Sequence, residues 1–374
     1  MADNNENKVL NVPHLRFPEF SGKWNKYTIN DLATVVGGGT PDTTVKSYWG
    51  GDIQWFTPSE IGKNKYVDFS KRTITRDGLD NSSAKLLPLH TILLSSRATV
   101  GECSIASNEC TTNQGFQSLI AKQCNIDFLY YLIQTKKKDL IRNACGSTFL
   151  EISANEIRKI KVAVPVQNEQ EQIAKLLSLI DERIATQNKI IEKLQSLIKG
   201  LAAQLTQSGT PNIRLCDCLE CHSSTLQENC VSVTGSYPVY GATGLIGYTN
   251  NYAYNGESIL IVKDGSGVGS LSYVNDHFSV IGTLNYLTAK ENYSILYLYY
   301  ALMAFNFTPY ITGMAIPHIY FKDYGKAKLF YPSIEKRIRI ASLLHNIEQK
   351  LVVEQNLVIS LSAQKSYLLR MLFI

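Results

Sequence analysis

The sequence predicts an α+β protein in which two globular segments form an internal repeat, each followed by a long helix. A heptad pattern of apolar residues runs from Ile173 to Leu205 and returns 167 positions later, from Ile340 to Leu372. Strand-like runs such as IQWFTP, TILLSS and SILIV precede the two patterns. A helical run then precedes the last strand of each segment. This order favours mixed α+β segments over a doubly wound sheet.

The chain of 374 residues is long enough for at least two hydrophobic cores. We divide it into a polar, disordered tail (1–13), a first globular segment (14–164), a first long helix (165–207), a second globular segment (208–331) and a second long helix (332–374). The tail is assigned from its composition, which is too polar to bury a core.

The run that starts at Pro165 is predicted to be one helix. We expect Asn168 to cap it, with Glu171 completing a capping box, and Gly209 and Pro211 follow its end. At about 1.5 Å per residue, the helix would be roughly 60 Å long. No single small domain buries that length, so the helix needs a partner.

The second helix supplies that partner. IAKLLSLID in the first helix matches IASLLHNIE in the second without a gap, and Pro165 matches Pro332. We therefore favour antiparallel pairing within the chain over a zipper between two chains. The residues predicted to pair are Ile173, Leu177, Ile180, Ile184, Gln187, Ile191, Leu194, Ile198, Ile340, Leu344, Ile347, Leu351, Glu354, Val358 and Leu361.

Three polar residues depart from the apolar seam. Gln187 and Glu354 occupy equivalent positions, where they either fix the register of the pair or lie partly exposed at a crossing. Lys365 interrupts the second seam.

The globular segments repeat more faintly than the helices. TILLSSRATVGECSI compares with SILIVKDGSGVGSLSY after one insertion, and FLYYLIQ resembles YLYYALM. At the 167-residue step, Gly115, Gly146 and Ile152 correspond to Gly282, Gly313 and Ile319.

Net charge and hydropathy limit the partners and the cellular location that we expect for the chain. The net charge of +5 permits an anionic partner without requiring one. The first residues lack the pattern of a signal peptide. The longest apolar run, YSILYLYYALMAFNF from Tyr293, is shorter than the roughly 20 residues that span a bilayer. We expect a buried helix there and a cytoplasmic protein.

The eight cysteines are expected to be reduced thiols. Cys216, Cys218, Cys221 and Cys230, with His222, include one pair at the spacing of a zinc knuckle. No second pair follows at the spacing of a zinc finger, so we favour small buried thiols and expect no metal site.

Catalytic motifs are missing from the sequence. GSGVGS lacks the spacing of a nucleotide-binding loop, and FTPY lacks the polar residue and first proline of an amino-methyltransferase motif. We expect no catalytic residue and no cofactor in this chain.

Basic, amide and aromatic residues in the predicted loops are candidates for DNA binding. Arginine, asparagine and glutamine can contact base edges, and lysine neutralises phosphates. Each could instead be a solvated surface residue or a packed tyrosine. The candidates are Lys46, Tyr48, Lys63, Lys65, Tyr66, Lys71, Arg72, Arg76, Arg97, Asn113 and Gln114 in the first segment, and Tyr237, Tyr240, Tyr248, Tyr252, Lys263, Asn285, His318 and Lys322 in the second.

Five stretches of the sequence resemble those of a known protein family. They are KSYWGGDIQWFTPSEI, LLSSRATVGECSI and GSTFLEISANEIRKIKVAVPVQNEQEQIAKLLSLID in the first half, and YPVYGATGLIGYTNNYAYNGESILIVKDGSGVGSLSY and YPSIEKRIRIASLL in the second. From about residue 14 onward, the chain resembles the specificity subunits of type I restriction-modification systems.

The resemblance implies two target-recognition domains, each reading one half of a split site in double-stranded DNA, with two antiparallel helices between them as a ruler. It implies a non-catalytic subunit that docks two methyltransferase subunits and restriction/translocase subunits. S-adenosylmethionine, ATP and Mg would bind to those partners. SSRAT in the first repeat corresponds to VKDGS in the second, and TNQGF corresponds to SVIGT. Because these stretches differ, the two half-sites are expected to differ.

Two other functions fit the residues alone. One is a coiled-coil scaffold whose tyrosine-rich domains bind a protein or a glycan. The other is a stand-alone enzyme such as a fused methyltransferase, which the missing motifs disfavour.

Overall fold

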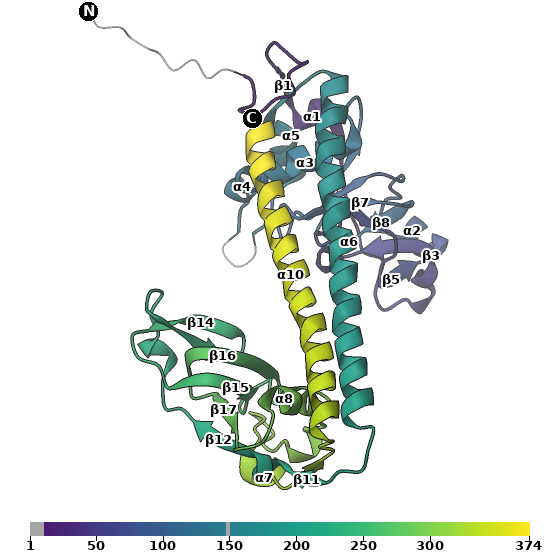
Figure 1. The fold of residues 1–374 in the computed structure, drawn as a ribbon. Coiled ribbons are helices and arrows are strands. Elements are labelled where there is room, and N and C mark those ends of the chain that lie inside the picture. Colours follow the sequence, from purple (N-terminus) through teal and green to yellow (C-terminus); the bar gives the residue numbers. More distant parts are fainter. Residues whose placement is uncertain (1–10, 147–149) are drawn as a thin grey trace, which may run out of the picture. The chain divides into compact units, whose positions relative to one another are not determined.

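The computed structural model describes residues 11–146 and 150–374 and confirms a mixed α and β fold with two long helices (Figure 1). It separates into two compact units. Unit 1 comprises Met1–Asn188 and Asn356–Ile374, and unit 2 comprises Lys189–Gln355. Most of the predicted tail lies outside the described residues. Asn11 exchanges backbone and side-chain hydrogen bonds with Trp24, which places it with the globular part of unit 1.

The two long helices are continuous. They are α6 (Gln167–Thr206) and α10 (Ile334–Leu372), and each contributes residues to both units. The prediction that Asn168 caps α6 is wrong, because the backbone amides of Glu169 and Gln170 already donate to the carbonyl of Val166. Asn168 therefore lies in the first turn, and Glu171 accepts a hydrogen bond from Gln167 rather than completing a capping box.

The described residues of unit 1 form three small sheets. A five-stranded sheet has the order β2 (Ala33–Gly37), β9 (Gln117–Ala121), β6 (Ile92–Leu94), β7 (Cys103–Ala106) and β4 (Tyr66–Val67). A three-stranded sheet has the order β5 (Arg72–Ile74), β3 (Trp49–Phe56) and β8 (Cys110–Thr112), and β1 (Asn25–Thr28) pairs with β10 (Lys161–Val164). Short helices complete the unit: α1 (Ile29–Leu32), η1 (Lys46–Tyr48), η2 (Pro58–Glu60), α2 (Arg76–Asp80), α3 (Ile126–Thr135), α4 (Lys137–Arg142) and α5 (Ala154–Lys159).

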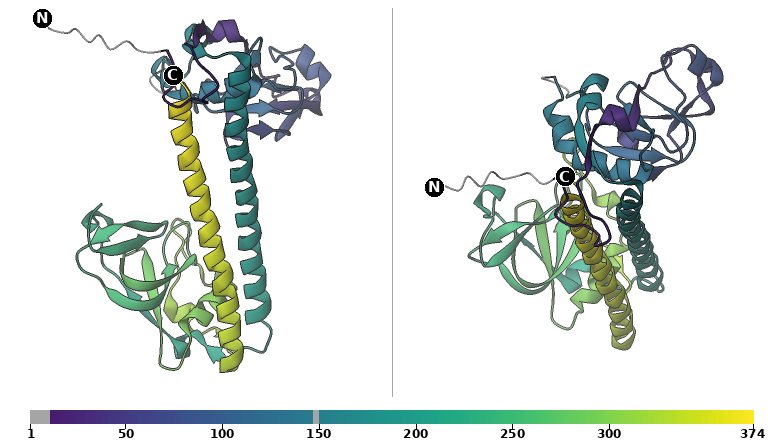
Figure 2. Two further views of the ribbon diagram at one scale, coloured as in Figure 1. Left: turned by 45° about the horizontal axis from the view of Figure 1, so that its top comes forward. Right: turned by 90° about the horizontal axis from the view of Figure 1, so that it is seen from above.

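The core of unit 1 joins the sheet to both long helices. Helix α3, which contributes Phe128 to Ile133, packs with Ile173 and Leu177 near the start of α6 and with Leu372 near the end of α10. Figure 2 shows the start of α6 beside the end of α10. The start of one helix shares a core with the end of the other, so the helices run antiparallel in this unit.

Unit 2 contains a six-stranded sheet. Its order is β12 (Leu219–Ser223), β17 (Leu284–Ala289), β15 (Tyr254–Val262), β16 (Leu271–Val280), β13 (Tyr237–Gly241) and β14 (Gly244–Thr249), and β11 (Ile213–Arg214) pairs separately with β18 (Lys328–Leu329). The helices are α7 (Leu215–Cys218), η3 (Glu228–Cys230), α8 (Ile295–Met303), η4 (Thr308–Tyr310) and α9 (Phe321–Tyr324).

The core of unit 2 repeats the arrangement of unit 1. Helix α8 packs with Ile198 and Ala202 near the end of α6 and with Ile340 and Leu344 near the start of α10. The apolar run from Tyr293 thus forms a mostly buried helix, as its sequence predicts. Among the described residues, no helix is both long and apolar enough to cross a membrane.

The internal repeat extends to individual backbone hydrogen bonds. The amide of Ile152 donates to the carbonyl of Ser96, and at the 167-residue step Ile319 donates to Lys263. An isolated antiparallel bridge joins Arg97 to Glu151, and its counterpart joins Asp264 to His318. The two units therefore share a local backbone frame even where their side chains differ.

Every residue of the predicted helical seam is buried or half-buried. Gln187 and Glu354 are only 3% and 6% exposed, so the alternative of partial exposure is wrong. Within unit 2, Glu354 also pairs with Lys350. Lys365 does not disrupt its helix, because its ammonium pairs with Asp181 of α6 at 2.7 Å.

Candidate nucleic-acid interface

A tyrosine–carboxylate contact fastens the globular part of unit 1 to the long helices. The hydroxyl of Tyr131 on α3 donates to Asp181 of α6 at 2.7 Å, and Lys365 of α10 pairs with the same carboxylate. Burial of the ring, followed by the charge of Asp181, raises the pKa of Tyr131 above its usual value. The contact therefore ties three helices together.

Unit 2 has a matching contact. Glu348 lies 167 positions after Asp181, and it accepts hydrogen bonds from Tyr299 and Tyr300 of α8 at 2.9 and 2.7 Å. Burial raises the pKa of both tyrosines, and the carboxylate of Glu348 adds to the shift. Sequence reasoning missed both contacts, although paired tyrosines in FLYYLIQ and YLYYALM and an acidic residue at the same repeat position signal them.

The starts of the two long helices are also locked in the same way. Gln170 donates from Nε2 to the carbonyl of Pro165, and Arg337, at the equivalent position, donates to the carbonyl of Pro332. Gln170 also accepts from the backbone amide of Asn125 at the start of α3. These bonds fix the entry of each helix against its own globular part.

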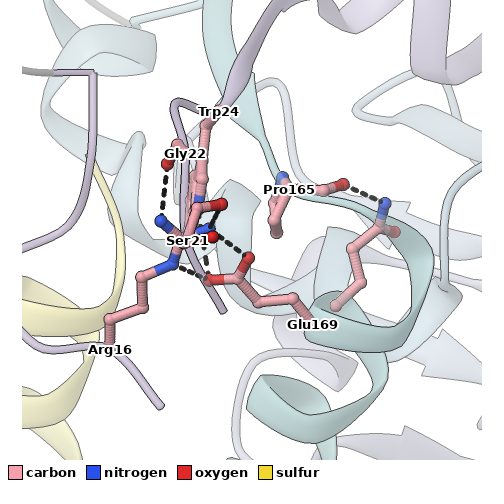
Figure 3. Close-up of polar contacts among 7 residues, drawn as sticks. Arg16, Ser21, Gly22, Trp24, Pro165 and Glu169 are labelled. Carbon is pink, nitrogen blue, oxygen red and sulfur yellow. Dashed lines mark hydrogen bonds and ion pairs between the residues drawn. The ribbon is translucent and has the colours of Figure 1, made fainter. Parts of the chain in front are cut away.

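The start of α6 holds a buried ion pair that has no counterpart in the predictions from sequence (Figure 3). Arg16 makes a two-pronged contact with Glu169, from Nε at 2.8 Å and from Nη2 at 2.7 Å, and Trp24 donates to the same carboxylate. The hydrogen bond to Glu169 raises the pKa of Arg16. The Glu169 side chain is fully buried, so this guanidinium is committed to the fold rather than to a ligand.

Three of the predicted DNA-binding residues already have structural partners. Lys65 is 8% exposed, and its ammonium contacts Ser178 at 2.6 Å and Asp127 at 2.8 Å. The hydroxyl of Tyr66 donates to Asp127, and the buried Asn285 accepts from the hydroxyl of Ser223. We leave these three residues out of the interface that we propose below.

A cavity of about 290 Å³ in unit 1 brings together three predicted residues: Arg97, Asn113 and Gln114. They come from the loop after β6 and the loop after β8. Thr57, Pro58, Ser59, Ala98 and Gly115 complete its lining. The Arg97 guanidinium is 48% exposed and pairs with Glu151 at 3.0 Å, a partner that sequence reasoning missed.

The other candidates of unit 1 lie at or beside the three-stranded sheet. The guanidinium of Arg72 lies 3.5 Å from the ring centroid of Trp49, and Trp49 meets Trp55 edge to face. Arg76 pairs with Asp80 on the same helix, and Tyr48 is half-buried beside it. Exposed lysines accompany them at positions 46 and 71, whereas the exposed Lys63 lies in the loop before β4 of the five-stranded sheet. The contact between the Arg72 guanidinium and the Trp49 ring was not predicted, because the two residues are distant in sequence.

The candidates of unit 2 form two groups. In the first group, Tyr237 and Tyr252 form a ring cluster with His277, which the sequence analysis missed; the ring centroids are 4.6 to 5.6 Å apart. Tyr248 lies on the neighbouring strand β14, while Tyr240 packs edge to face on Phe278.

The second group lies around the bridge between Asp264 and His318. His318 and Lys322 both lie against the ring of Tyr320, and Lys263 is 3.8 Å from the carboxylate of Asp264. The side chains therefore differ from those at the equivalent positions of unit 1.

In the cysteine cluster of unit 2, Cys218 is buried and Cys216 and Cys221 are half-buried, but Cys230 is exposed, so the prediction of a buried thiol is wrong for Cys230. Burial raises the pKa of Cys218 to about 12 and that of Cys221 to about 11, so both remain thiols at neutral pH. His222 stacks on Tyr286 and contacts the hydroxyl of Thr288. Within residues 11–146 and 150–374, no three histidine, cysteine or acidic side chains gather as a metal site would require.

A comparison with known protein families finds the same internal repeat. Residues 21–196 and 213–361 each match the model of the type I restriction modification DNA specificity domain. The chain belongs to this family. The two matches fall on the two halves of the repeat, so the protein carries two copies of the specificity domain.

Curated relatives include specificity subunits from archaea and bacteria. The chain is 40% identical over 182 residues to the type I restriction enzyme MjaIX specificity subunit of Methanocaldococcus jannaschii. The aligned residues are 46% of this chain and 41% of that relative. It is 25% identical over 355 residues to the EcoprrI specificity subunit of Escherichia coli, and this alignment covers 86% of this chain and 86% of that relative.

Solved structures show the same fold. The S subunit of the type I restriction-modification system from M. genitalium superposes with a TM-score of 0.66 at 19% identity, covering 97% of this chain and 99% of that one. A chain from a study of complex assembly in the type I system superposes with a TM-score of 0.54 at 14% identity, covering 92% and 96%.

Proposed function

We propose that this protein is the non-catalytic DNA specificity subunit of a type I restriction-modification complex, and that it reads an asymmetric, bipartite site in double-stranded DNA. One observation carries the proposal: two copies of one domain share a backbone frame but differ in the side chains of their loops. Two related recognition domains with different loops are suited to a DNA site whose two halves differ.

Each unit would read one half of the site. In unit 1, the cavity that contains Arg97, Asn113 and Gln114 supplies donors for base edges. In unit 2, the ring cluster of Tyr237, Tyr252 and His277 and the group around His318 are the corresponding surfaces. Exposed lysines, Lys46, Lys63 and Lys71 in unit 1 and Lys322 in unit 2, would neutralise phosphates and orient the protein.

The two long helices would set the distance between the two half-sites. Each helix is continuous, with 40 residues in α6 and 39 in α10, and antiparallel pairing occurs in both units. Two repeats joined by antiparallel helices would be related by an approximate two-fold axis, which would match the local two-fold symmetry of duplex DNA. The spacer would therefore depend on helix length, and base choice on the loops.

The chemistry would reside on partner subunits. Two methyltransferase subunits would supply S-adenosylmethionine and flip an adenine out of the duplex for N6 methylation. Restriction/translocase subunits would use ATP and Mg. Helix α10 exposes Ile338, Leu343, Val352, Val353 and Ile359, apolar side chains that suit a protein partner.

The modest charge fits this division of labour. With a net charge of +5, the isolated subunit should bind DNA weakly, and because lysines supply its phosphate contacts, its affinity should fall as the salt concentration rises. Partners that enclose the DNA would add the rest. A cytoplasmic location follows from the same role, because the substrate is chromosomal and invading DNA.

The proposal is tested by expressing the chain with a type I methyltransferase subunit and mapping N6-methyladenine in the host genome. We expect methylation within a two-part motif that disappears when this gene is deleted. A motif that persists after deletion would show that specificity lies elsewhere.

A further inference from the structure

The cavity of unit 1 is built from two loops that backbone hydrogen bonds hold together. The amide of Ser96, next to Arg97, donates to the carbonyl of Gly115, and the amide of Asn113 donates to the carbonyl of Phe56 at the end of β3. A Cβ at Gly115 would lie 3.0 Å from the ring of Pro58. The loops are therefore in close contact, and their polar side chains line one cavity.

The free polar groups of this cavity are hydrogen-bond donors. Asn113 uses Oδ1 to accept from the backbone amide of Gly115 at 2.8 Å, which fixes the orientation of its carboxamide and leaves Nδ2 as a donor. Arg97 carries five N–H groups and no acceptor. Its ion-pair partner Glu151 lies 3.0 Å from Nη2, and the hydroxyls of Ser59 and Thr57 share one hydrogen bond.

The charge at the cavity favours a neutral base edge over a phosphate. Arg97 and Glu151 form a pair at 3.0 Å, so the positive charge of the guanidinium is already balanced. A phosphate would meet the carboxylate of Glu151 as well as the cation. A base edge bears no net charge, and the planar guanidinium presents parallel N–H donors to it.

Among the base pairs, guanine alone presents two neighbouring acceptors, O6 and N7, in the major groove. Adenine presents a donor beside N7, cytosine presents a donor, and thymine presents one acceptor beside a methyl group. We propose that the cavity of unit 1 reads a guanine through Arg97 and Asn113. This inference rests on the proposed function and assigns one base class to one half-site.

Unit 2 carries no equivalent of this donor set. At the 167-residue step Arg97, Asn113 and Gln114 are replaced by Asp264, Val280 and Ile281, and the last two are buried. The backbone turn itself is kept, since Ala98 and Gly265 at equivalent positions both have positive φ, 64° and 99°. The guanine contact should therefore belong to one half-site only.

The test uses the methyltransferase complex with the full chain and two matched variants. Arg97→Lys keeps the charge and removes the planar fork, while Arg142→Lys makes the same change at an exposed arginine outside the cavity. We expect Arg97→Lys to reduce the preference for guanine at one position of one half-site by about 5- to 150-fold. Arg142→Lys should leave the motif unchanged, and melting temperatures confirm that both variants fold.

Base analogues identify the groove and the atoms. 7-Deazaguanine at that position lacks N7 and should reduce methylation, whereas inosine keeps O6 and N7 and should be tolerated. Asn113→Asp keeps the acceptor for Gly115 and replaces the free donor, so it should weaken the same position. The salt dependence of binding should keep its slope in Arg97→Lys, because a base contact releases no counterion.

Three results would overturn the inference while leaving the proposed function intact: an unchanged motif in Arg97→Lys, a relaxed position that is not guanine, or an unaltered response to 7-deazaguanine. A wild-type complex that methylates DNA without any two-part motif would instead overturn the proposed function, and the inference with it.

Discussion

The carboxylate of Glu348 is expected to stabilise unit 2 more than any exposed ion pair on the same helix. It accepts hydrogen bonds from Tyr299 and Tyr300, whose rings are buried in the core between α8 and α10. A hydrogen bond to a charged group contributes about 1.5 to 3 kcal/mol. Glu348→Ala should therefore lower the free energy of unfolding of unit 2 by about 3 to 5 kcal/mol, because two buried hydroxyls lose their acceptor.

The protein offers two separate optical probes for this measurement. All three tryptophans, Trp24, Trp49 and Trp55, lie in unit 1, whereas 15 of the 21 tyrosines lie in unit 2, so the near-ultraviolet circular dichroism of tyrosine reports mainly on unit 2. With a urea m-value of about 2 kcal/mol per molar, the tyrosine-monitored midpoint of Glu348→Ala should fall by about 2 M. Tryptophan fluorescence should report a smaller shift.

Two variants serve as controls for the same helix. Glu348→Gln keeps an acceptor and should cost less than Glu348→Ala. Glu335→Ala removes an exposed pair with Arg339 and should change the free energy of unfolding by no more than about 0.5 kcal/mol. The reasoning is refuted if Glu348→Ala is no more destabilising than Glu335→Ala.

Three further predictions concern pH, the start of α6 and helix length. Because burial raises the pKa of Tyr299 and Tyr300, the native state keeps protons that the unfolded chain releases above about pH 10. Stability should therefore fall as pH rises beyond that value, and Tyr300→Phe should flatten the decline in an alkaline titration; an unchanged slope would contradict this cause. Arg16→Ala leaves the buried carboxylate of Glu169 without its cation and should destabilise unit 1 by about 3 kcal/mol or more by tryptophan fluorescence, and a loss below 1 kcal/mol would count against a committed ion pair. Inserting one heptad into both α6 and α10 lengthens each by about 10 Å, so the spacer of the methylated motif should widen by roughly three base pairs, with the half-sites unchanged in the methylation map.

Helix periodicity made much of the fold predictable from the sequence. The seams of α6 and α10 follow a regular heptad pattern, and the 167-residue step aligns them without a gap, so their pairing could be inferred before any contact was known. The sequence also predicted the buried helix α8 from its apolar run. It misplaced the cap of α6, because local turn geometry at Val166 decides where the first helical hydrogen bond forms.

The candidate interface was less predictable, since the state of a polar side chain depends on partners distant in sequence. Lys65 has the same local sequence appearance as the exposed Lys63, yet it contacts Ser178 and Asp127, which lie on other elements. Likewise Glu151, 54 positions from Arg97, was not recognised as its partner. Residue type alone cannot separate a committed cation from a free one.

The most direct test of the central claim is an exchange of globular segments between this chain and a relative of different specificity, followed by genome-wide mapping of N6-methyladenine. We predict that replacing residues 14–164 changes one half of the methylated motif and leaves the other half and the spacer as they were. A change in both halves, or in neither, would contradict a protein built from two independent readers of DNA.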